Sequence, residues 1–128
     1  LTPNGVLAGS VAALSASYTV VAADGTNAPL GLFVNDAAGR SWESNQAIAS
    51  NKLTIARGMP HVEVDVYETN STAAGHAALV YAVGDALYAS AYGLLTKEMT
   101  VDGDETVIGI VTKVPTVSSP TLGVAMRI

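Results

Sequence analysis

A chain of 128 residues is long enough for one domain with a single hydrophobic core and leaves little room for a second. Its formal net charge of −5 and its six scattered Lys and Arg residues argue against a nucleic-acid partner, because proteins bind polyanions through clustered cations. The absence of cysteine excludes disulfides and thiolate metal sites, and a charged fraction of only 13% is low for a surface that faces water alone.

The first 17 residues are predicted to form an extended arm that precedes a single β domain of residues 18–128. They are rich in Gly, Ser and Ala and show weak hydrophobic periodicity. The stretch is apolar, but Pro3, Gly5 and Gly9 interrupt it before it reaches the roughly 18 to 20 apolar residues of a membrane-spanning helix. It also lacks the basic start of a signal peptide. We therefore expect neither a signal peptide nor a membrane anchor.

Two strands are expected next along the chain. Residues 18–22 are rich in β-branched side chains and run into a turn at Asp24 and Gly25. Residues 30–34 form a continuous apolar run that is typical of a fully buried strand. The following polar residues, 40–51, favour at most a single helical turn.

The clearest strand pattern of the chain lies at residues 62–67, after a shorter expected strand at residues 53–56. Side chains of a strand point alternately to its two faces, so a period of two indicates one buried and one wet face. The predicted buried face carries Val62, Val64 and Val66, and the predicted wet face carries Glu63, Asp65 and Tyr67. Residues 70–75 are expected to form a loop, and residues 77–83 lead into the next strand pair.

A β-hairpin is predicted within residues 81–96. Its first strand covers residues 86–90, the chain turns at Tyr92 and Gly93, and the second strand covers residues 94–96. Gly93 is the residue expected to take a positive φ in this turn, because glycine has no Cβ to clash there.

Two further strands are expected at residues 107–114 and 121–128, after an acidic turn at residues 102–105. Gly109 inside the first of them marks a bulge or a close backbone approach. The chain thus has about eight short strands separated by turns. This pattern predicts an all-β fold, a small β-sandwich or barrel with an extended N-terminal arm.

No residue pattern of the chain points to catalysis or to a cofactor. His61 and His76 are fifteen residues apart and match no metal-ligand spacing, and Ser10 lacks the second glycine of a nucleophile elbow. The acidic turn at residues 102–105 lacks the pattern of a calcium-binding EF-hand loop, and we expect it to be a solvated hairpin tip. We therefore expect no enzyme, no cofactor and no metal site.

Tyr81, Tyr88 and Tyr92 offer two interpretations. Their aromatic faces suit a platform on which a sugar stacks, and the same residues suit cross-strand packing within the predicted hairpin. The sequence favours the packing interpretation.

The carboxyl half of the chain resembles that of small virion structural proteins of tailed bacteriophages, and the nearest group is the capsid decoration, or cement, proteins. The resemblance rests on residues 83–88 (VGDALY), 90–96 (SAYGLLT), 107–111 (VIGIV) and 120–124 (PTLGV). Residues 29–36 (PLGLFVND) are similar to the amino half of such proteins.

The resemblance implies a virion protein that sits in many copies on the outer capsid surface, as a homo-oligomer with a trimer favoured, and clamps neighbouring subunits of the major capsid protein. Neither a nucleic acid nor a membrane is an expected partner. The arm would add a strand to a capsid edge, with backbone hydrogen bonds providing affinity. Its apolar residues are the expected partner contacts: Leu1, Pro3, Val6, Leu7, Val11 and Leu14. The alternatives are a carbohydrate- or cell-surface-binding β-module and a tail structural component.

Overall fold

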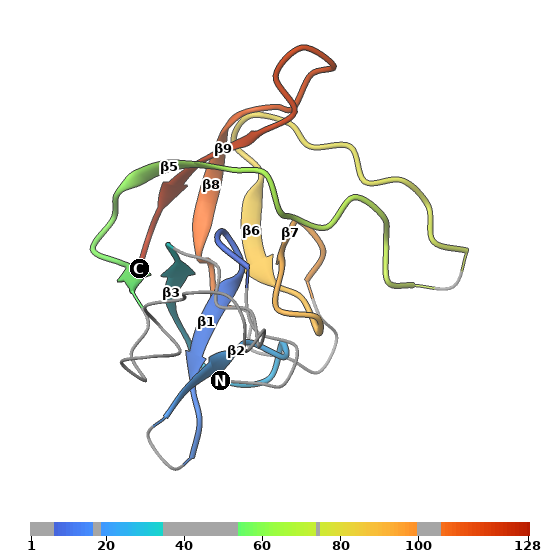
Figure 1. The fold of residues 1–128 in the computed structure, drawn as a ribbon. Coiled ribbons are helices and arrows are strands. Elements are labelled where there is room, and N and C mark those ends of the chain that lie inside the picture. Colours follow the sequence, from blue (N-terminus) through green and yellow to red (C-terminus); the bar gives the residue numbers. More distant parts are fainter. Residues whose placement is uncertain (1–6, 17–18, 35–53, 74, 100–105) are drawn as a thin grey trace, which may run out of the picture.

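The computed structural model describes residues 7–16, 19–34, 54–73, 75–99 and 106–128. In these ranges the chain forms nine strands, arranged in two antiparallel sheets, and no helix (Figure 1). The prediction of a small all-β sandwich or barrel is confirmed. The possible helical turn at residues 40–51 and the acidic turn at residues 102–105 lie outside the described residues.

The first sheet has the strand order β2-β1-β3-β4 and contains the main departure from prediction. Its strands are β1 (Val11–Leu14), β2 (Val20–Ala22), β3 (Pro29–Phe33) and β4 (Ile55–Ala56). β1 pairs with both β2 and β3, so residues 11–14 form an interior strand where the sequence predicted an extended arm.

The burial of β1 explains why its pattern was missed. Val11 and Ala13 belong to the main hydrophobic core, whereas Ala12 packs with Phe33 in a second cluster on the other face of the strand. A strand that is covered on both faces shows no alternation of apolar and polar residues. With two alanines among its four residues, it resembles a loose, small-residue segment in sequence.

The second sheet has the order β5-β9-β8-β6-β7, and its strands follow the predictions closely. They are β5 (His61–Val64), β6 (Ala86–Ala89), β7 (Leu95–Thr96), β8 (Gly109–Lys113) and β9 (Leu122–Met126). β6 and β7 form the predicted hairpin, and Gly93 has a φ of 78° in its turn. The approach predicted at Gly109 is also present, because a Cβ there would lie 2.5 Å from Cγ1 of Val124.

The core lies between the two sheets and ties them together. Its main cluster takes side chains from the first sheet and from the second, among them Val11, Leu32, Val64, Leu87 and Leu122. Tyr67, predicted on the wet face of its strand, instead packs against this cluster and meets Tyr81 edge to face, with 5.6 Å between the ring centroids.

Between β5 and β6 the chain leaves the body, runs outward and returns (Figure 1). We call residues 68–83 the projecting segment. Its two arms are joined by an isolated bridge between Asn70 and Ala78 and by hydrogen bonds from Ser71 N to Ala77 O at 2.7 Å and from Leu79 N to Thr69 O at 2.9 Å. The described residues of the loop predicted at 70–75, which are 70–73 and 75, lie in the outer part of this segment (Figure 1).

Candidate functional site

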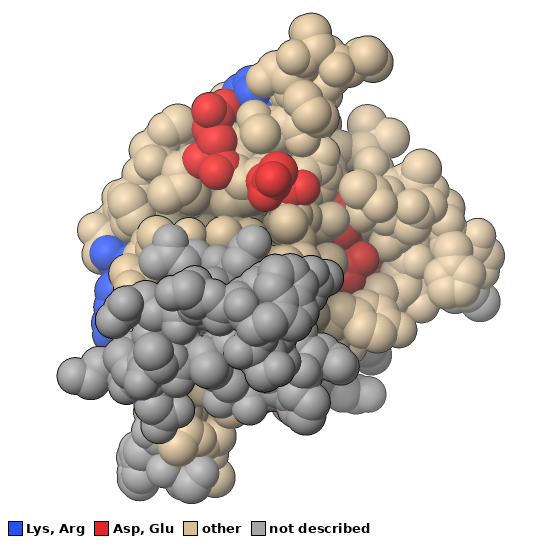
Figure 2. Space-filling view, in the orientation of Figure 1, with Lys and Arg blue, Asp and Glu red and all other residues tan. Residues whose placement is uncertain are grey.

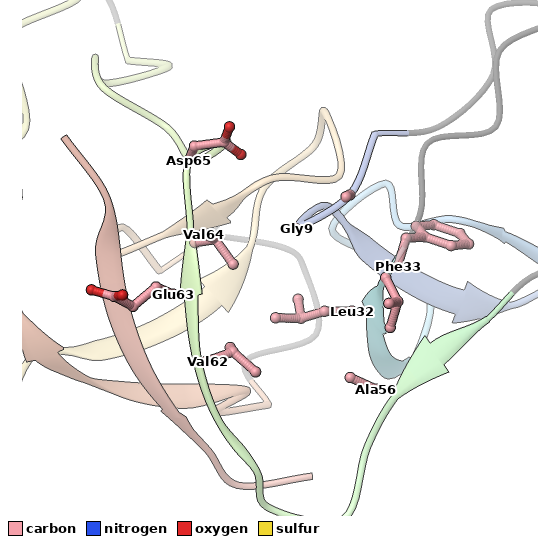
Figure 3. A pocket seen from close by; sticks show the side chains of 10 residues that line it. Gly9, Leu32, Phe33, Ala56, Val62, Glu63, Val64 and Asp65 are labelled. Atoms are coloured by element: carbon pink, nitrogen blue, oxygen red, sulfur yellow. The ribbon is translucent and has the colours of Figure 1, made fainter. Parts of the chain in front are cut away.

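A groove of about 200 Å³ opens between β5 of the second sheet and strands β3 and β4 of the first (Figure 3). Val62 and Val64 point from β5 towards Leu32 of β3, and Gly9 closes the groove beside Val64. The groove is mainly apolar, and the Glu63 side chain points away from it (Figure 3); its lining residues are Ala8, Gly9, Leu32, Phe33, Val34, Ala56, Val62, Glu63, Val64 and Asp65.

The alternation of β5 builds one wall of this groove. Val64 is buried, whereas His61, Glu63 and Asp65 are exposed. β5 thus presents valines to the interior and polar side chains to solvent, as its sequence pattern predicted.

Among the described residues, β5 lies at the end of its sheet and pairs only with β9, so no described strand pairs with its other long edge. Met126 N donates to Pro60 O at 2.9 Å. In an antiparallel ladder the bonded pairs alternate, so the backbone groups of Val62 and Val64 face β9 and those of His61 and Glu63 face away from it.

The outer face of β5 carries Glu63, whereas Asp65 follows the strand in a bend and its side chain points to the opposite side (Figure 3). Figure 2 shows Asp and Glu side chains gathered on the described part of one face of the molecule. Glu63 forms an ion pair with Lys113 at 2.8 Å, which lowers the pKa of the Glu63 carboxyl. Lys113 also donates to Oγ1 of Thr121 at 2.8 Å. Asp65 is exposed and has no ion-pair partner among the described residues.

A second candidate surface lies on the projecting segment. Val80 and Val83 are 77% and 69% exposed, although their neighbour Tyr81 is buried. The Tyr81 hydroxyl donates to Glu68 O at 2.5 Å, and burial raises the pKa of this hydroxyl far above its ordinary value. Lys97 Nζ donates to Val80 O at 2.6 Å, so the base of the segment is held in place while its valines face solvent.

The residues predicted to contact a partner do not form one surface. Leu1, Pro3 and Val6 lie outside the described residues. Leu7 is 53% exposed and Leu14 is 36% exposed, whereas Val11 is completely buried in β1. The expectation that Val11 contacts a partner is therefore wrong, because its side chain belongs to the core between the sheets.

The two histidines and the serine that were weighed as metal ligands or as a nucleophile make ordinary structural contacts. His61 Nε2 lies 2.7 Å from Thr112 Oγ1, His76 Nδ1 lies 3.1 Å from Ser71 O, and the Ser10 hydroxyl donates to Leu7 O at 2.6 Å. Within the described ranges no group of three or more His, Asp or Glu side chains is placed to hold a metal ion. The burial of Tyr81 removes it from any sugar-stacking platform with Tyr88 and Tyr92.

Sequence reasoning missed both surfaces. The alternation at residues 62–67 indicated one wet face, but it did not show that the strand lies at a sheet edge. Pro60 at the start of the strand was the available signal, since proline in sheets is confined to edges, strand starts and bulges. The exposure of Val80 and Val83 had no such signal, because apolar residues next to a predicted strand suggest burial.

No family model, curated protein or solved structure matches this chain. Among the described residues, no helix has the length and apolar character needed to cross a membrane.

Proposed function

We propose that the protein is a capsid decoration protein of a tailed bacteriophage. It binds the outer surface of the head, as a trimer, and stabilises contacts between subunits of the major capsid protein. It acts by binding and not by catalysis. The sequence resemblance of residues 83–88, 90–96, 107–111 and 120–124 to such proteins supports this function, and so does the scarcity of charge on the chain.

The exposure of apolar side chains on the projecting segment is the observation that carries the proposal. Val80 and Val83 stand in solvent on a segment whose base is fixed by Tyr81 and Lys97. Full burial of a valine side chain is favourable by about 1.5–3 kcal/mol before the costs of association are subtracted. A capsid surface that covers this segment gains such a contribution at every copy, and bound copies that contact one another add avidity.

The amino end remains a second proposed contact. Leu7 is exposed just before β1, and the residues ahead of it would extend the contact towards a neighbouring capsid subunit. Deletion of residues 1–17 is a poor test of this role, because it removes β1 from the centre of the first sheet.

Binding to undecorated, expanded phage heads tests the proposed function. The purified protein is mixed with heads, and the copy number per head and head survival on heating are measured. We expect saturable binding that strengthens the heads, and we expect the double variant Val80→Ser with Val83→Ser to bind much more weakly. Val117→Ser is the matched control, because Val117 is fully exposed in the turn between β8 and β9.

Other outcomes point to other functions. Failure to bind heads, together with ring or tube assembly by the pure protein, would indicate a tail component. Binding to glycans by the isolated domain would indicate a carbohydrate- or cell-surface-binding module. Equal binding by the double variant and by Val117→Ser would remove the projecting segment from the contact.

A further inference from the structure

We propose that the projecting segment docks, in a preformed conformation, into an uncharged and apolar recess of the major capsid protein, and that Asp85 and Lys97 hold it in that conformation. This docking rests on the proposed function and deepens it, because it names the chemistry of the partner's surface. Three properties of the segment support it: the apolar side chains that it exposes, its lack of charged residues, and the contacts that fix its base.

The segment exposes small apolar side chains on the part that returns to the body. They are Val80 and Val83, which are 77% and 69% exposed, and Ala77, Ala78 and Ala82. Methyl and isopropyl groups let a covering surface approach the backbone closely. Because the segment projects from the body (Figure 1), a surface that covers it has to be concave. A narrow recess lined by apolar side chains therefore fits it.

The segment also lacks charge. Residues 69–84 contain no Asp, Glu, Lys or Arg, although the chain as a whole has a net charge of −5. A charged side chain of the partner that was buried against this stretch would lose its water and find no opposite charge, which is costly. Charge matching thus selects an uncharged surface on the partner.

An ion pair at the base fixes the backbone that carries the two valines. Oδ2 of Asp85 accepts a hydrogen bond from Ala82 N at 2.8 Å and lies 3.1 Å from Nζ of Lys97. The same Nζ donates to Val80 O at 2.6 Å. The Ala82 N–H and the Lys97 ammonium lower the pKa of the Asp85 carboxyl, so this group is ionised at neutral pH. The pair therefore bonds the chain on both sides of Tyr81 and adds no net charge to the surface.

The base is also joined to the second sheet. Gly84 N donates to Val111 O at 2.8 Å, and Val111 N donates to Asp85 O at 2.9 Å. The Tyr81 side chain belongs to the main core. Backbone that is ordered before binding loses little conformational freedom when it binds, and this preserves affinity. Asp85 and Lys97 are thus positioning residues of the binding surface.

Amide hydrogen exchange on the free protein tests the positioning role without a partner. The Ala82 amide is bonded to Asp85, whereas the Gly84 amide is bonded to Val111 and serves as the internal control. We expect Asp85→Ala to speed exchange at Ala82 about two- to tenfold and to leave Gly84 nearly unchanged. Asp85→Asn should have a smaller effect, because its side-chain oxygen can still accept the hydrogen bond. Unchanged exchange at Ala82 in Asp85→Ala would refute the positioning role and leave the capsid role intact.

Charges of either sign at Val83 test the chemistry of the recess. Val83→Lys and Val83→Glu are compared with the natural protein for binding to undecorated, expanded heads. We expect both variants to bind about tenfold or more weakly, since neither charge finds a partner in an uncharged recess. Val117→Lys and Val117→Glu are the matched controls, because they change the net charge equally on the exposed turn between β8 and β9. Both controls should bind like the natural protein.

Substitution of Lys97 connects the ion pair with binding. Lys97→Met removes the cation and should weaken head binding about two- to tenfold, the cost of ordering a segment that is no longer fixed. Lys97→Arg keeps a cation at this position and should recover most of the affinity. A Lys97→Met protein that binds heads like the natural protein would refute the positioning role.

The same assays separate the docking from the capsid role. Tighter head binding with one sign of charge at position 83 would refute the uncharged recess and leave the capsid role intact. Failure of the natural protein to bind heads would refute both. Sedimentation of the protein alone adds a further outcome: an oligomer that dissociates in both position-83 variants, with head binding unchanged, would assign the segment to a contact between copies of this chain and overturn the docking.

Discussion

At Gly93 the turn of the β6–β7 hairpin approaches the first sheet. Its φ of 78° lies in the left-handed region, and a Cβ built there would sit 2.8 Å from the carbonyl oxygen of Ala23. Val11 N donates to Gly93 O at 2.7 Å, so the same residue joins the hairpin to β1. Glycine is required here both for its backbone conformation and for the space that its missing side chain leaves.

Substitution of Gly93 by alanine should therefore cost more stability than a positive φ alone explains. We expect Gly93→Ala to lower the free energy of unfolding by about 2 kcal/mol or more, measured by urea denaturation. Gly84→Ala is the control, because Gly84 has a φ of 96° but no atom within 4 Å of the added Cβ. It should cost about 1 kcal/mol. Equal losses of unfolding free energy in the two variants would show that the hairpin turn moves to accommodate the added Cβ at position 93.

The ion pair of Glu63 and Lys113 gives a second prediction at this scale. Lys113 lowers the pKa of Glu63 in the folded protein from its ordinary value of 4.5. The pair therefore stabilises the fold above about pH 4.5, and this contribution is lost as the pH falls through the lower folded pKa. We expect the melting temperature of Lys113→Met to lie below that of the natural protein at pH 7, by an amount that shrinks towards pH 3.

The hydrogen bonds of Lys113 and the choice of control both bear on this experiment. Its hydrogen bonds to Ser119 and Thr121 do not titrate in this range, so a small constant difference in melting temperature should persist at low pH. Arg127→Met is the control, since Arg127 forms no ion pair within the described part of the chain. A difference between Lys113→Met and the natural protein that grows on acidification would contradict the expected direction.

Among the elements, β1 is the one whose role differs most from expectation. Val11 is fully buried and Leu14, at the other end of the same strand, is 36% exposed. We expect Val11→Ala to lower the free energy of unfolding by about 2 kcal/mol, through lost burial and the cavity left behind. Leu14→Ala should cost about 1 kcal/mol or less, because much of that side chain already faces water.

Chemical denaturation of both variants decides between a core strand and a loose arm. If residues 11–14 were an arm outside the core, neither substitution would move the unfolding midpoint. A larger loss for Val11→Ala than for Leu14→Ala, despite the smaller side chain at position 11, is the result that a central strand requires.

The elements that sequence predicted best are those with one buried and one wet face, or with a turn that only glycine suits. The alternation at Val62 and Val64 and the turn at Gly93 are local signals, so they can be recognised in the sequence without knowledge of the fold. β1 and the edge position of β5 depend on which strands lie beside them. The residues of β1 do not show that strands lie on both sides of it, and Pro60 was the one local signal for the edge position of β5, so both features were established only by the structure.

At the scale of the whole molecule, the two sheets share one main core. Leu32 of the first sheet and Leu122 of the second both belong to it. We expect Leu32→Ala and Leu122→Ala each to lower the free energy of unfolding by about 2–5 kcal/mol. Each variant should retain a single cooperative transition by both circular dichroism and fluorescence, because neither sheet can lose its packing alone. Two transitions in either variant would show that the sheets unfold separately.

The turn between β8 and β9 closes on itself. Thr116 N donates to Ser119 O at 2.9 Å and Ser119 N donates to Thr116 O at 3.2 Å, with Val117 fully exposed at the tip. These two hydrogen bonds join the ends of the turn, and each doubling of loop length adds only about 0.6 kcal/mol of closure entropy. A foreign epitope inserted after Val117 would be displayed at one defined point on every copy, away from both sheets' shared core.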